Sequence, residues 1–347
     1  MRDQLAGKLP VTLITGFLGS GKTTLLSKLV RHPLMNKVAV IINEIGEIGI
    51  DHDLVTQSTE NISLLANGCI CCSVRTDMQE TLRDLFARRQ VGEVFDFDRV
   101  VIETTGLADP APIIQTLTSD TLLEARFRLD GVVTLVDTVN ANNLLDTQLE
   151  SVRQIALADR LLLTKCDLSD EGSIVSLEKR LRTLNPMASF IRVLNGEIAP
   201  SDLINIGLSS NKVQSTSNKF LTNLVELQDD NQQDRYLGDF SEKHISIKTL
   251  SLTFKEPFTW PAFSSALELL TTLRGPDLLR VKGILNVQGR PVVIQGVQHI
   301  FHKPVELDSW PSENHSTRIV FITRNNISIE MIKNLFSAVG AITQAEI

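Results

Sequence analysis

The stretch VTLITGFLGSGKTTLLSKLV, residues 11–30, decides the first half of the fold. A short apolar run rich in β-branched residues leads into the pattern G-x-x-x-x-G-K-[ST], and residues with helical spacing follow directly. Glycines let the backbone curl so that successive N–H groups point at phosphate oxygens, and the positive end of the following helix points to the same place. The stretch therefore predicts a strand, a phosphate-binding loop and a helix, with a nucleotide bound at the loop.

Two polar residues of this loop have separate expected roles. Lys22 should reach the β- and γ-phosphates of the nucleotide, and the hydroxyl of Thr23 should bind Mg²⁺. The alternative is a glycine-rich turn without a ligand. Such a turn does not require a strand before it and a helix after it in register, so a phosphate site is favoured.

Further apolar runs continue the pattern along the chain. They alternate with segments of helical period such as 73–90 and 148–158. The runs are residues 38–42, 99–102, 131–136, 160–164 and 189–193. The alternation predicts an α/β fold over residues 1–207, a P-loop NTPase with a doubly wound, mostly parallel sheet that is buried on both faces.

The chain changes character after about residue 208. Residues 208–243 are polar and poor in apolar periodicity, which indicates a linker, interrupted by a short helix expected at 220–227. From His244 onwards an alternating stretch, a helical stretch and a hairpin-like pair follow, and a strand and a helix close the chain. Residues 244–347 are therefore expected to form a smaller α+β domain with an antiparallel sheet.

Composition excludes several classes of function. The chain has 347 residues, is 42% hydrophobic and carries a net charge of -7 with scattered basic residues, so no nucleic acid partner is expected. No stretch has the length of a membrane span, and the N-terminal residues lack the pattern of an export signal. The expected location is the cytoplasm, whose reducing conditions disfavour structural disulfides.

A second strand end carries residues that suit a nucleotide. RVVIETTG, residues 99–106, is an apolar run that ends in Glu103 and is followed by Gly106. The carboxylate can hold the Mg²⁺ shell, and the glycine N–H can meet the γ-phosphate. The alternative is an ordinary strand-end glutamate with a turn glycine, which is less favoured in a chain that already carries a phosphate loop.

A third strand end suits recognition of the base. RLLLTKCDL, residues 160–168, ends in a T-K-C-D sequence. The carboxylate of Asp167 can accept hydrogen bonds from guanine N1–H and N2–H₂, a donor pair that adenine lacks, and the stem of Lys165 can cover the base. GTP is therefore favoured over ATP.

Three of the four cysteines stand in NGCICC, residues 67–72. A disulfide between neighbours would be strained, and a redox pair is more usually C-x-x-C. Cys69, Cys71 and Cys72 together form a soft ligand set that suits Zn²⁺ and, less selectively, Co²⁺ or Cu(I). Metal binding is favoured over redox chemistry, and redox chemistry over inert packing. A carboxylate such as Glu44, or a water, would leave one position exchangeable.

In this order, TGFLGSGKTT, INEIGEIGID, NGCICC, ETTGLADP and TKCDL resemble the CobW-type P-loop GTPases, a family associated with handling zinc and cobalt. The resemblance extends to LLRVKGILNVQG and VELDSW in the second domain. For catalysis it implies Lys22, Glu103 and Gly106. For nucleotide binding it implies Gly16, Gly19, Ser20, Gly21, Lys22, Thr23, Thr24, Asp51, Thr164, Lys165 and Asp167. For Mg²⁺ it implies Thr23 and Glu103, for Zn²⁺ Cys69, Cys71, Cys72 and Glu44, and for the switch segment Asn43, Glu44, Gly46 and Asp51.

Two departures from the family pattern bear on these implications. Many GTPases carry Asn where this chain has Thr164, and that Asn bonds the base and ties loops together, so guanine selectivity could be softer here. Many family members also carry a histidine-rich tract in the linker. This chain has six histidines in all and no such tract, so the cysteine motif stands as the metal site.

These features lead to the expectation of a GTPase that binds Zn²⁺ through the cysteines and transfers it to a client metalloprotein or apo-enzyme, with hydrolysis coupled to release. Slow turnover is expected because no Gln stands in an obvious water-orienting position after Gly106. One alternative is cobalt delivery for cobalamin assembly, since thiolates accept Co²⁺ as well. Another is a nucleotide-dependent interaction protein with structural cysteines. A homo-oligomer is compatible with the sequence.

Overall fold

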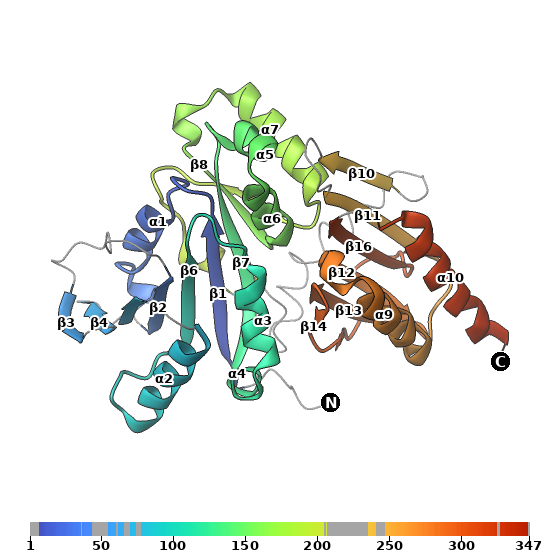
Figure 1. The fold of residues 1–347 in the computed structure, drawn as a ribbon, viewed down its shortest axis with the longest axis horizontal. Coiled ribbons are helices and arrows are strands. Elements are labelled where there is room, and N and C mark those ends of the chain that lie inside the picture. The colour runs from blue at the N-terminus through green and yellow to red at the C-terminus, as the bar shows by residue number, and fades with distance from the viewer. Residues whose placement is uncertain are drawn as a thin grey trace. The chain divides into compact units, whose positions relative to one another are not determined.

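A computed structural model of the chain describes residues 7–35, 37–43, 55–59, 62–65, 70–73, 78–204, 206, 235–240, 247–324 and 327–345. The chain divides into two compact units (Figure 1). The first unit consists of Met1–Leu177 and Ser189–Asn211, and the second of Glu178–Ala188 and Lys212–Ile347.

The first unit is built on a sheet whose described strands follow the order β3-β4-β5-β2-β6-β1-β7-β8-β9. From β5 to β9 in this order the strands pair in parallel, whereas β3 and β4 pair antiparallel at one edge. The strands are β1 (Leu9–Gly16), β2 (Val38–Asn43), β3 (Val55–Thr59), β4 (Ile62–Leu65), β5 (Ile70–Ser73), β6 (Arg99–Thr104), β7 (Phe127–Asp137), β8 (Arg160–Thr164) and β9 (Ser189–Arg192). The predicted α/β fold with a mostly parallel sheet is confirmed.

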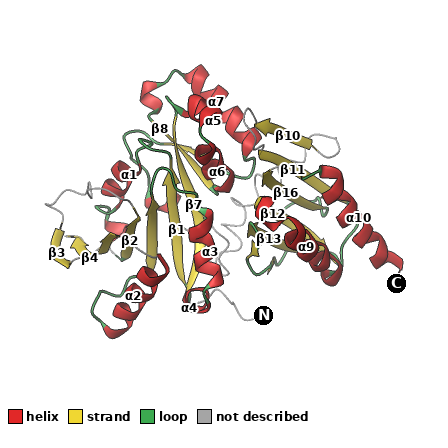
Figure 2. Ribbon diagram, viewed as in Figure 1, coloured by secondary structure: helices red, strands yellow, loops and turns green. Residues whose placement is uncertain are grey.

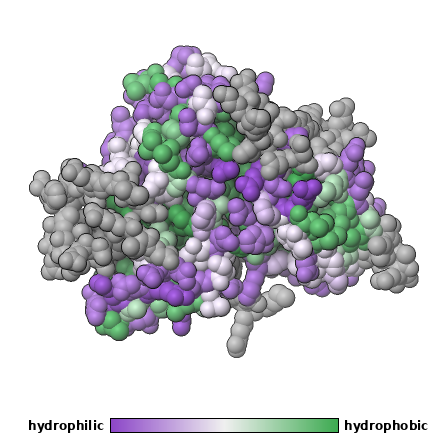
Figure 3. Space-filling model, in the orientation of Figure 1, coloured by the Kyte–Doolittle hydropathy of each residue, from purple (hydrophilic) through white to green (hydrophobic). Residues whose placement is uncertain are grey.

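Helices connect these strands, as parallel pairing requires (Figure 2). They are α1 (Lys22–Leu29), α2 (Met78–Val91), α3 (Ala111–Ser119), α4 (Thr121–Arg126), α5 (Ala141–Thr147), α6 (Leu149–Leu157) and α7 (Glu171–Leu184), with short 3-10 helices at Pro33–Met35, Cys166–Leu168 and Pro200–Asp202. All residues of β6 and β8 are buried, which shows that both faces of the sheet are covered. Leu25, Leu26 and Leu29 of α1 pack with sheet residues in one cluster. Side chains over α2 are mainly hydrophilic (Figure 3).

The second unit is an antiparallel sheet with two long helices on one face. Its described strands follow the order β10-β11-β16-β12-β13-β14, with β15 paired to β13. They are β10 (Arg235–Phe240), β11 (Ile247–Phe254), β12 (Leu278–Val287), β13 (Arg290–Val297), β14 (Ile300–Phe301), β15 (Val305–Glu306) and β16 (Thr317–Arg324), and the helices are α9 (Trp260–Arg274), the 3-10 turn Gly275–Asp277 and α10 (Ile329–Ala345). The expected α+β domain is confirmed.

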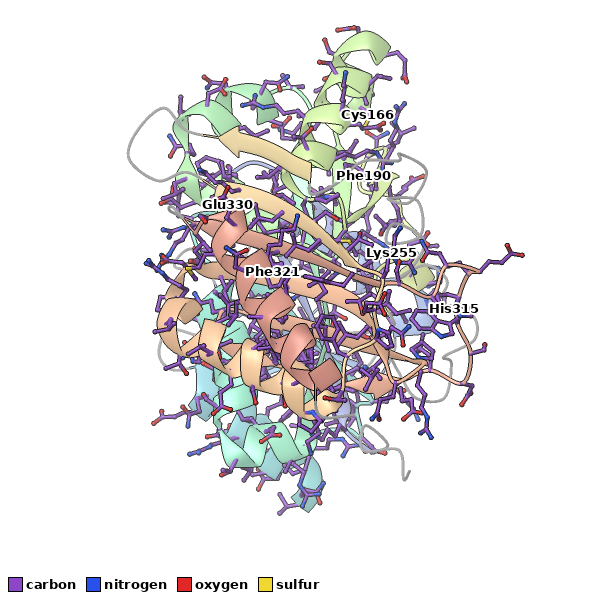
Figure 4. All side chains as sticks on the ribbon, turned by 90° about the vertical axis from the view of Figure 1, so that its right-hand side faces the viewer. Cys166, Phe190, Lys255, His315, Phe321 and Glu330 are labelled. Carbon is purple, nitrogen blue, oxygen red and sulfur yellow. The ribbon has the colours of Figure 1, made fainter. Side chains whose placement is uncertain are left out.

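Aromatic side chains form the core between this sheet and its helices. Phe321 of β16 lies beneath α10 (Figure 4), with its ring centroid 6.1 Å from that of Phe336. Phe263 of α9 lies 5.3 Å from Phe336. Helix α9 leaves Trp260, Leu269 and Leu273 exposed.

Two elements differ from the sequence patterns. The polar stretch expected as a linker contains β10, which pairs antiparallel with β11. The segment of helical period 73–90 is expected to begin next to the cysteines, but residues 70–73 form β5, which pairs in parallel with β2, and α2 begins only at Met78. The short helix expected at 220–227 lies outside the described residues. The proposed boundaries at 207 and 243 remain predictions.

Candidate functional site

The phosphate loop joins β1 to α1, and three of its glycines adopt a positive φ. Gly16, Gly19 and Gly21 have φ values of +142°, +75° and +95°. A Cβ added to Gly16 would lie 2.5 Å from the carbonyl oxygen of Leu135 on β7. Only glycine therefore lets the loop pack against β7 and turn into the N-terminus of α1. The N–H groups at this helix end lack intrahelical acceptors and are suited to phosphate oxygens.

Lys22 is the first residue of α1, and its side chain folds back over the loop. It is 6% exposed, and its Nζ donates to the carbonyl oxygens of Gly16 at 2.9 Å and Phe17 at 3.3 Å. A buried ammonium group requires such hydrogen bonds. They hold the positive charge at the loop, where a phosphate oxygen would be within its reach.

Glu103 ends the apolar part of β6, next to β1 in parallel register. The carboxyl group is buried, and Thr23 Oγ1 donates to Glu103 Oε1 at 3.4 Å. A hydroxyl and a carboxylate oxygen brought together beside a phosphate loop are the hard oxygen ligands that Mg²⁺ takes, together with phosphates and waters. The residues present fit the expected Mg²⁺.

Gly106 lies directly against the phosphate loop. A Cβ at this position would lie 2.6 Å from both N and Cδ2 of Leu18. The end of β6 is also joined to the end of β1, since Thr104 Oγ1 donates to Thr15 Oγ1 at 2.7 Å. The two loops are thus in backbone contact, and no larger residue fits at Gly106.

The end of β8 is tied to the phosphate loop by Thr164. Its Oγ1 donates to the carbonyl oxygen of Ser20 at 2.9 Å and lies 3.3 Å from that of Val136. The sequence pattern raised the question of what replaces the usual Asn. Here the threonine hydroxyl makes the connection between the two loops.

Lys165 and Asp167, the two residues expected to recognise the base, differ in their surroundings. Lys165 has a φ of +58°, and its Nζ lies 2.8 Å from Asp137 Oδ2 at the end of β7. Burial alone would raise the pKa of Asp137, but hydrogen bonds from Lys165, Asn140 and the Val139 N–H outweigh it and hold that pKa below its usual range. Asp167 is exposed, so its carboxylate is open to a ligand.

Three residues near the loops were missed by sequence reasoning. Asp137 ends a predicted strand, a position that could have marked it. Gln154 of α6 donates to the loop after β6, and nothing in its helical neighbourhood indicated this. Gly196 follows β9, and a Cβ there would lie 3.3 Å from Thr24 Cγ2. The preceding residue, Asn195, also has a positive φ, and an N-G pair is a turn signal.

The expected metal ligands lie largely outside the described part of the chain. Cys69, Glu44, Gly46 and Asp51 are not among the described residues, and Asn43 ends β2. In the backbone, Cys71 and Cys72 pair in parallel with Val40 and Ile41 of β2. Among the side chains that the structure describes, no group of three or more His, Cys, Asp or Glu could hold a metal. Cys166, labelled in Figure 4, is not part of a disulfide, and its Sγ donates to the carbonyl oxygen of Leu163 at 3.3 Å.

A parallel sheet with a glycine loop after its central strand, a lysine at the start of the next helix and a buried acid on the neighbouring strand define a P-loop nucleotide-binding protein. The chain belongs to the CobW/HypB/UreG family. The nucleotide-binding domain of that family matches residues 10–192, and the cobalamin synthesis protein cobW C-terminal domain matches residues 247–339.

Individual relatives agree with this assignment. The zinc chaperone YjiA of Escherichia coli (strain K12) is 36% identical over 318 residues, which cover 90% of this chain and 93% of the relative. The zinc-regulated GTPase metalloprotein activator 1 of Schizosaccharomyces pombe is 31% identical over 331 residues, 86% of this chain and 77% of the relative.

Solved structures of the E. coli relative are also similar. The Zn(II)-bound YjiA GTPase matches with a TM-score of 0.73 and 32% identity, over 96% of this chain and 99% of that one. A Zn(II)-bound triple mutant, in which one glutamate and two cysteines are replaced by alanine, matches with a TM-score of 0.74 and 31% identity over the same shares of the two chains. Among the described residues, no helix is both long and apolar enough to cross a membrane.

Proposed function

We propose that this protein is a GTPase that acts as a zinc metallochaperone. Zn²⁺ binds to Cys69, Cys71 and Cys72 with Glu44, and the metal passes to a client metalloprotein or apo-enzyme as GTP is hydrolysed. Membership of the CobW/HypB/UreG family and similarity to proteins named as zinc chaperones support this proposal. The thiolates suit Zn²⁺ chemically, and a reducing cytoplasm would keep them available.

The observation that carries the proposal is the order of four neighbouring strands, β5-β2-β6-β1. The cysteine motif runs into β5, and Ile42 of β2 pairs with Glu103 of β6. Because adjacent strands are about 4.8 Å apart, the backbone of the cysteine strand lies only about 10 Å from that of the glutamate strand. Strand β2 lies between the two and ends at Asn43, and Glu44 is the next residue in the sequence. A change at the nucleotide therefore has a short route to the metal ligands.

Every residue that is proposed to contact the nucleotide lies in the part of the chain that the structure describes. Lys22 donates to the β- and γ-phosphates, Thr23 and Glu103 hold Mg²⁺, and the N–H of Gly106 meets the γ-phosphate. When bound, Mg²⁺ neutralises phosphate charge. At the other end, Asp167 accepts from guanine and the stem of Lys165 covers the base, while Asp137 holds the Nζ of Lys165 in place.

Turnover is expected to be slow without a partner or metal. No glutamine follows Gly106 in a position to orient the attacking water. Gln154 lies nearby, but its amide N–H groups donate to loop carbonyls. A fast hydrolysis rate in metal-free protein would contradict this part of the proposal.

The coupling of nucleotide to metal is tested by competitive zinc titration of the full chain, loaded either with a non-hydrolysable GTP analogue or with GDP. We expect tighter Zn²⁺ binding in the GTP-like state and, by reciprocity, tighter binding of the analogue in the presence of Zn²⁺. Equal zinc affinity in the two nucleotide states would contradict the proposed coupling. Replacing Cys69, Cys71 and Cys72 together by Ser should abolish the tight site, with Cys166→Ser as the control that leaves it intact.

The same titration distinguishes the alternative functions. If the triple Ser variant keeps its metal affinity, its GTP hydrolysis and its client binding, the cysteines are structural and the protein is a nucleotide-dependent interaction protein. If Co²⁺ competes better than Zn²⁺ in the GTP-like state, cobalt delivery is favoured. Affinity must be measured rather than metal content, because the E. coli variant that lacks one glutamate and two cysteines is itself named as Zn(II)-bound.

A further inference from the structure

Helix α6 makes three contacts with the loop that follows β6. Gln154 Nε2 donates to the carbonyl oxygens of Gly106 at 3.1 Å and Ala108 at 3.0 Å. One residue earlier, Arg153 pairs with Asp109 at 3.5 Å. The backbone carbonyl oxygen of Gln154 in turn accepts from Thr134 Oγ1 on β7 at 2.9 Å, which anchors the helix to the sheet. The glutamine amide is 1% exposed and clamps two carbonyls of one short loop.

The other end of the same amide faces a small cavity under the phosphate loop. Gln154 Oε1, Ser151 Oγ and Ser20 Oγ are buried, and none has a hydrogen-bond partner among the described residues. All three residues line one cavity of about 20 Å³. A volume of roughly 10–15 Å³ is enough for one water, and a buried water needs two to four polar partners. Space and partners for one bridging water are therefore present between α6 and the phosphate loop.

We propose that Gln154 is a positioning residue for GTP hydrolysis: it holds the Gly106 loop against the phosphate loop through its two N–H groups, and its Oε1 is linked to Ser20 by a water in this cavity. The inference rests on the proposed function, in which the N–H of Gly106 meets the γ-phosphate. Gly106 packs closely against the phosphate loop, since a Cβ at this position would lie 2.6 Å from the N of Leu18. A hydrogen bond to the Gly106 carbonyl restrains the ψ angle of this glycine and thereby helps to hold its N–H in place.

The main test is steady-state hydrolysis and nucleotide binding by Gln154→Met in the full chain. Methionine has a similar length but no donor. Because loss of alignment by about 1 Å can cost on the order of 100-fold in rate, we expect kcat to fall about 10- to 100-fold. GDP affinity should change less than about twofold, since GDP lacks the phosphate that the loop contacts. Ser151→Ala, which lines the same cavity without touching the loop, should retain kcat within about threefold.

A second variant keeps the test decisive if Gln154→Met folds poorly. Gln154→Glu carries an O–H donor only when its carboxyl group is protonated. Its kcat relative to wild type should therefore rise as the pH is lowered from 8 towards 6, while GDP affinity stays parallel to that of wild type. If Gln154 only supports the fold, the ratio of the Gln154→Glu kcat to the wild-type kcat should not change with pH.

Three outcomes separate the hypotheses. If wild type does not hydrolyse GTP, the proposed function fails. If wild type hydrolyses GTP and both Gln154 variants match it, the positioning role is wrong. If kcat and GDP affinity fall together in Gln154→Met and the Gln154→Glu ratio does not change with pH, Gln154 only supports the fold.

Discussion

At the scale of single residues, Asp167 offers the sharpest test of base recognition. Its carboxylate is exposed and can accept from guanine N1–H and N2–H₂. Asp167→Asn should weaken GTP binding and strengthen binding of xanthosine triphosphate, because xanthine carries a carbonyl where guanine has the amino group and an amide can donate to it. A site built on such bonds discriminates by leaving unmatched groups unpaired.

Competition binding with the two nucleotides measures this exchange. Asp170→Asn is the matched control, since Asp170 is an exposed carboxylate nearby that caps α7 through the Ser173 N–H, and Asn serves as a cap as well. Unchanged preference in Asp167→Asn would show that the T-K-C-D loop does not read the base.

Asp137 predicts a pH dependence of stability. Its pKa is lowered in the folded protein by hydrogen bonds from Lys165, Asn140 and the Val139 N–H, which together exceed the opposing effect of burial. A carboxyl group with a lowered folded pKa stabilises the fold above its ordinary pKa of about 3.9 and loses that contribution as the pH falls through the folded value. Asp137→Asn should therefore lower Tm at pH 7, and the difference from wild type should shrink below about pH 4. Parallel Tm curves across that range would contradict this assignment.

At the scale of elements, strand β16 contains a buried arginine that destabilises the folded protein. Arg318 is 4% exposed, and its three guanidinium nitrogens have no hydrogen-bond partner among the described residues. Burial lowers the pKa of Arg318 to about 10. At pH 7 the guanidinium is still charged, and its charge is less favourable in the folded protein than in the unfolded chain. Its burial therefore lowers the free energy of unfolding, and this effect is present in full below the folded pKa.

Replacing this arginine should therefore stabilise the protein. Arg318→Met keeps the apolar stem and removes the charge, so the free energy of unfolding should rise by about 1–3 kcal/mol. Chemical denaturation at pH 7 measures the change. The control is Arg290→Met, because Arg290 pairs with Glu306 at the surface and such pairs contribute little. A loss of stability in Arg318→Met would indicate that the guanidinium has a stabilising role.

The elements themselves divide into those that sequence patterns reveal and those that they do not. The parallel strands of the first unit are runs of Val, Ile and Leu because both of their faces are buried, and such runs can be recognised without a structure. The edge strands β3 and β4 have weak patterns. They form because an antiparallel ladder connects them to β5, which itself pairs with β2.

At the scale of the whole molecule, the division into units does not follow the chain. Residues 178–188 belong to the second unit, although the residues on either side of them, 1–177 and 189–211, belong to the first. Within the second unit, Thr249 Oγ1 of β11 donates to the carbonyl oxygen of Leu184 at 2.7 Å. The end of α7 is therefore part of the second unit. A boundary placed by composition alone could not include it, since the contact joins residues 65 positions apart.

The sequence by itself determined the phosphate loop, the parallel sheet, the antiparallel second domain and the family, because these depend on local spacing and on residue types at adjacent positions. The tertiary structure decided which distant groups meet: Thr164 with Ser20 across 144 positions, Thr23 with Glu103 across 80, and Gln154 with Gly106 across 48. Such pairs depend on the order of strands in the sheet and on the packing of α6 beneath the loops. Periodicity specifies which face of an element is buried, but not which element will cover it.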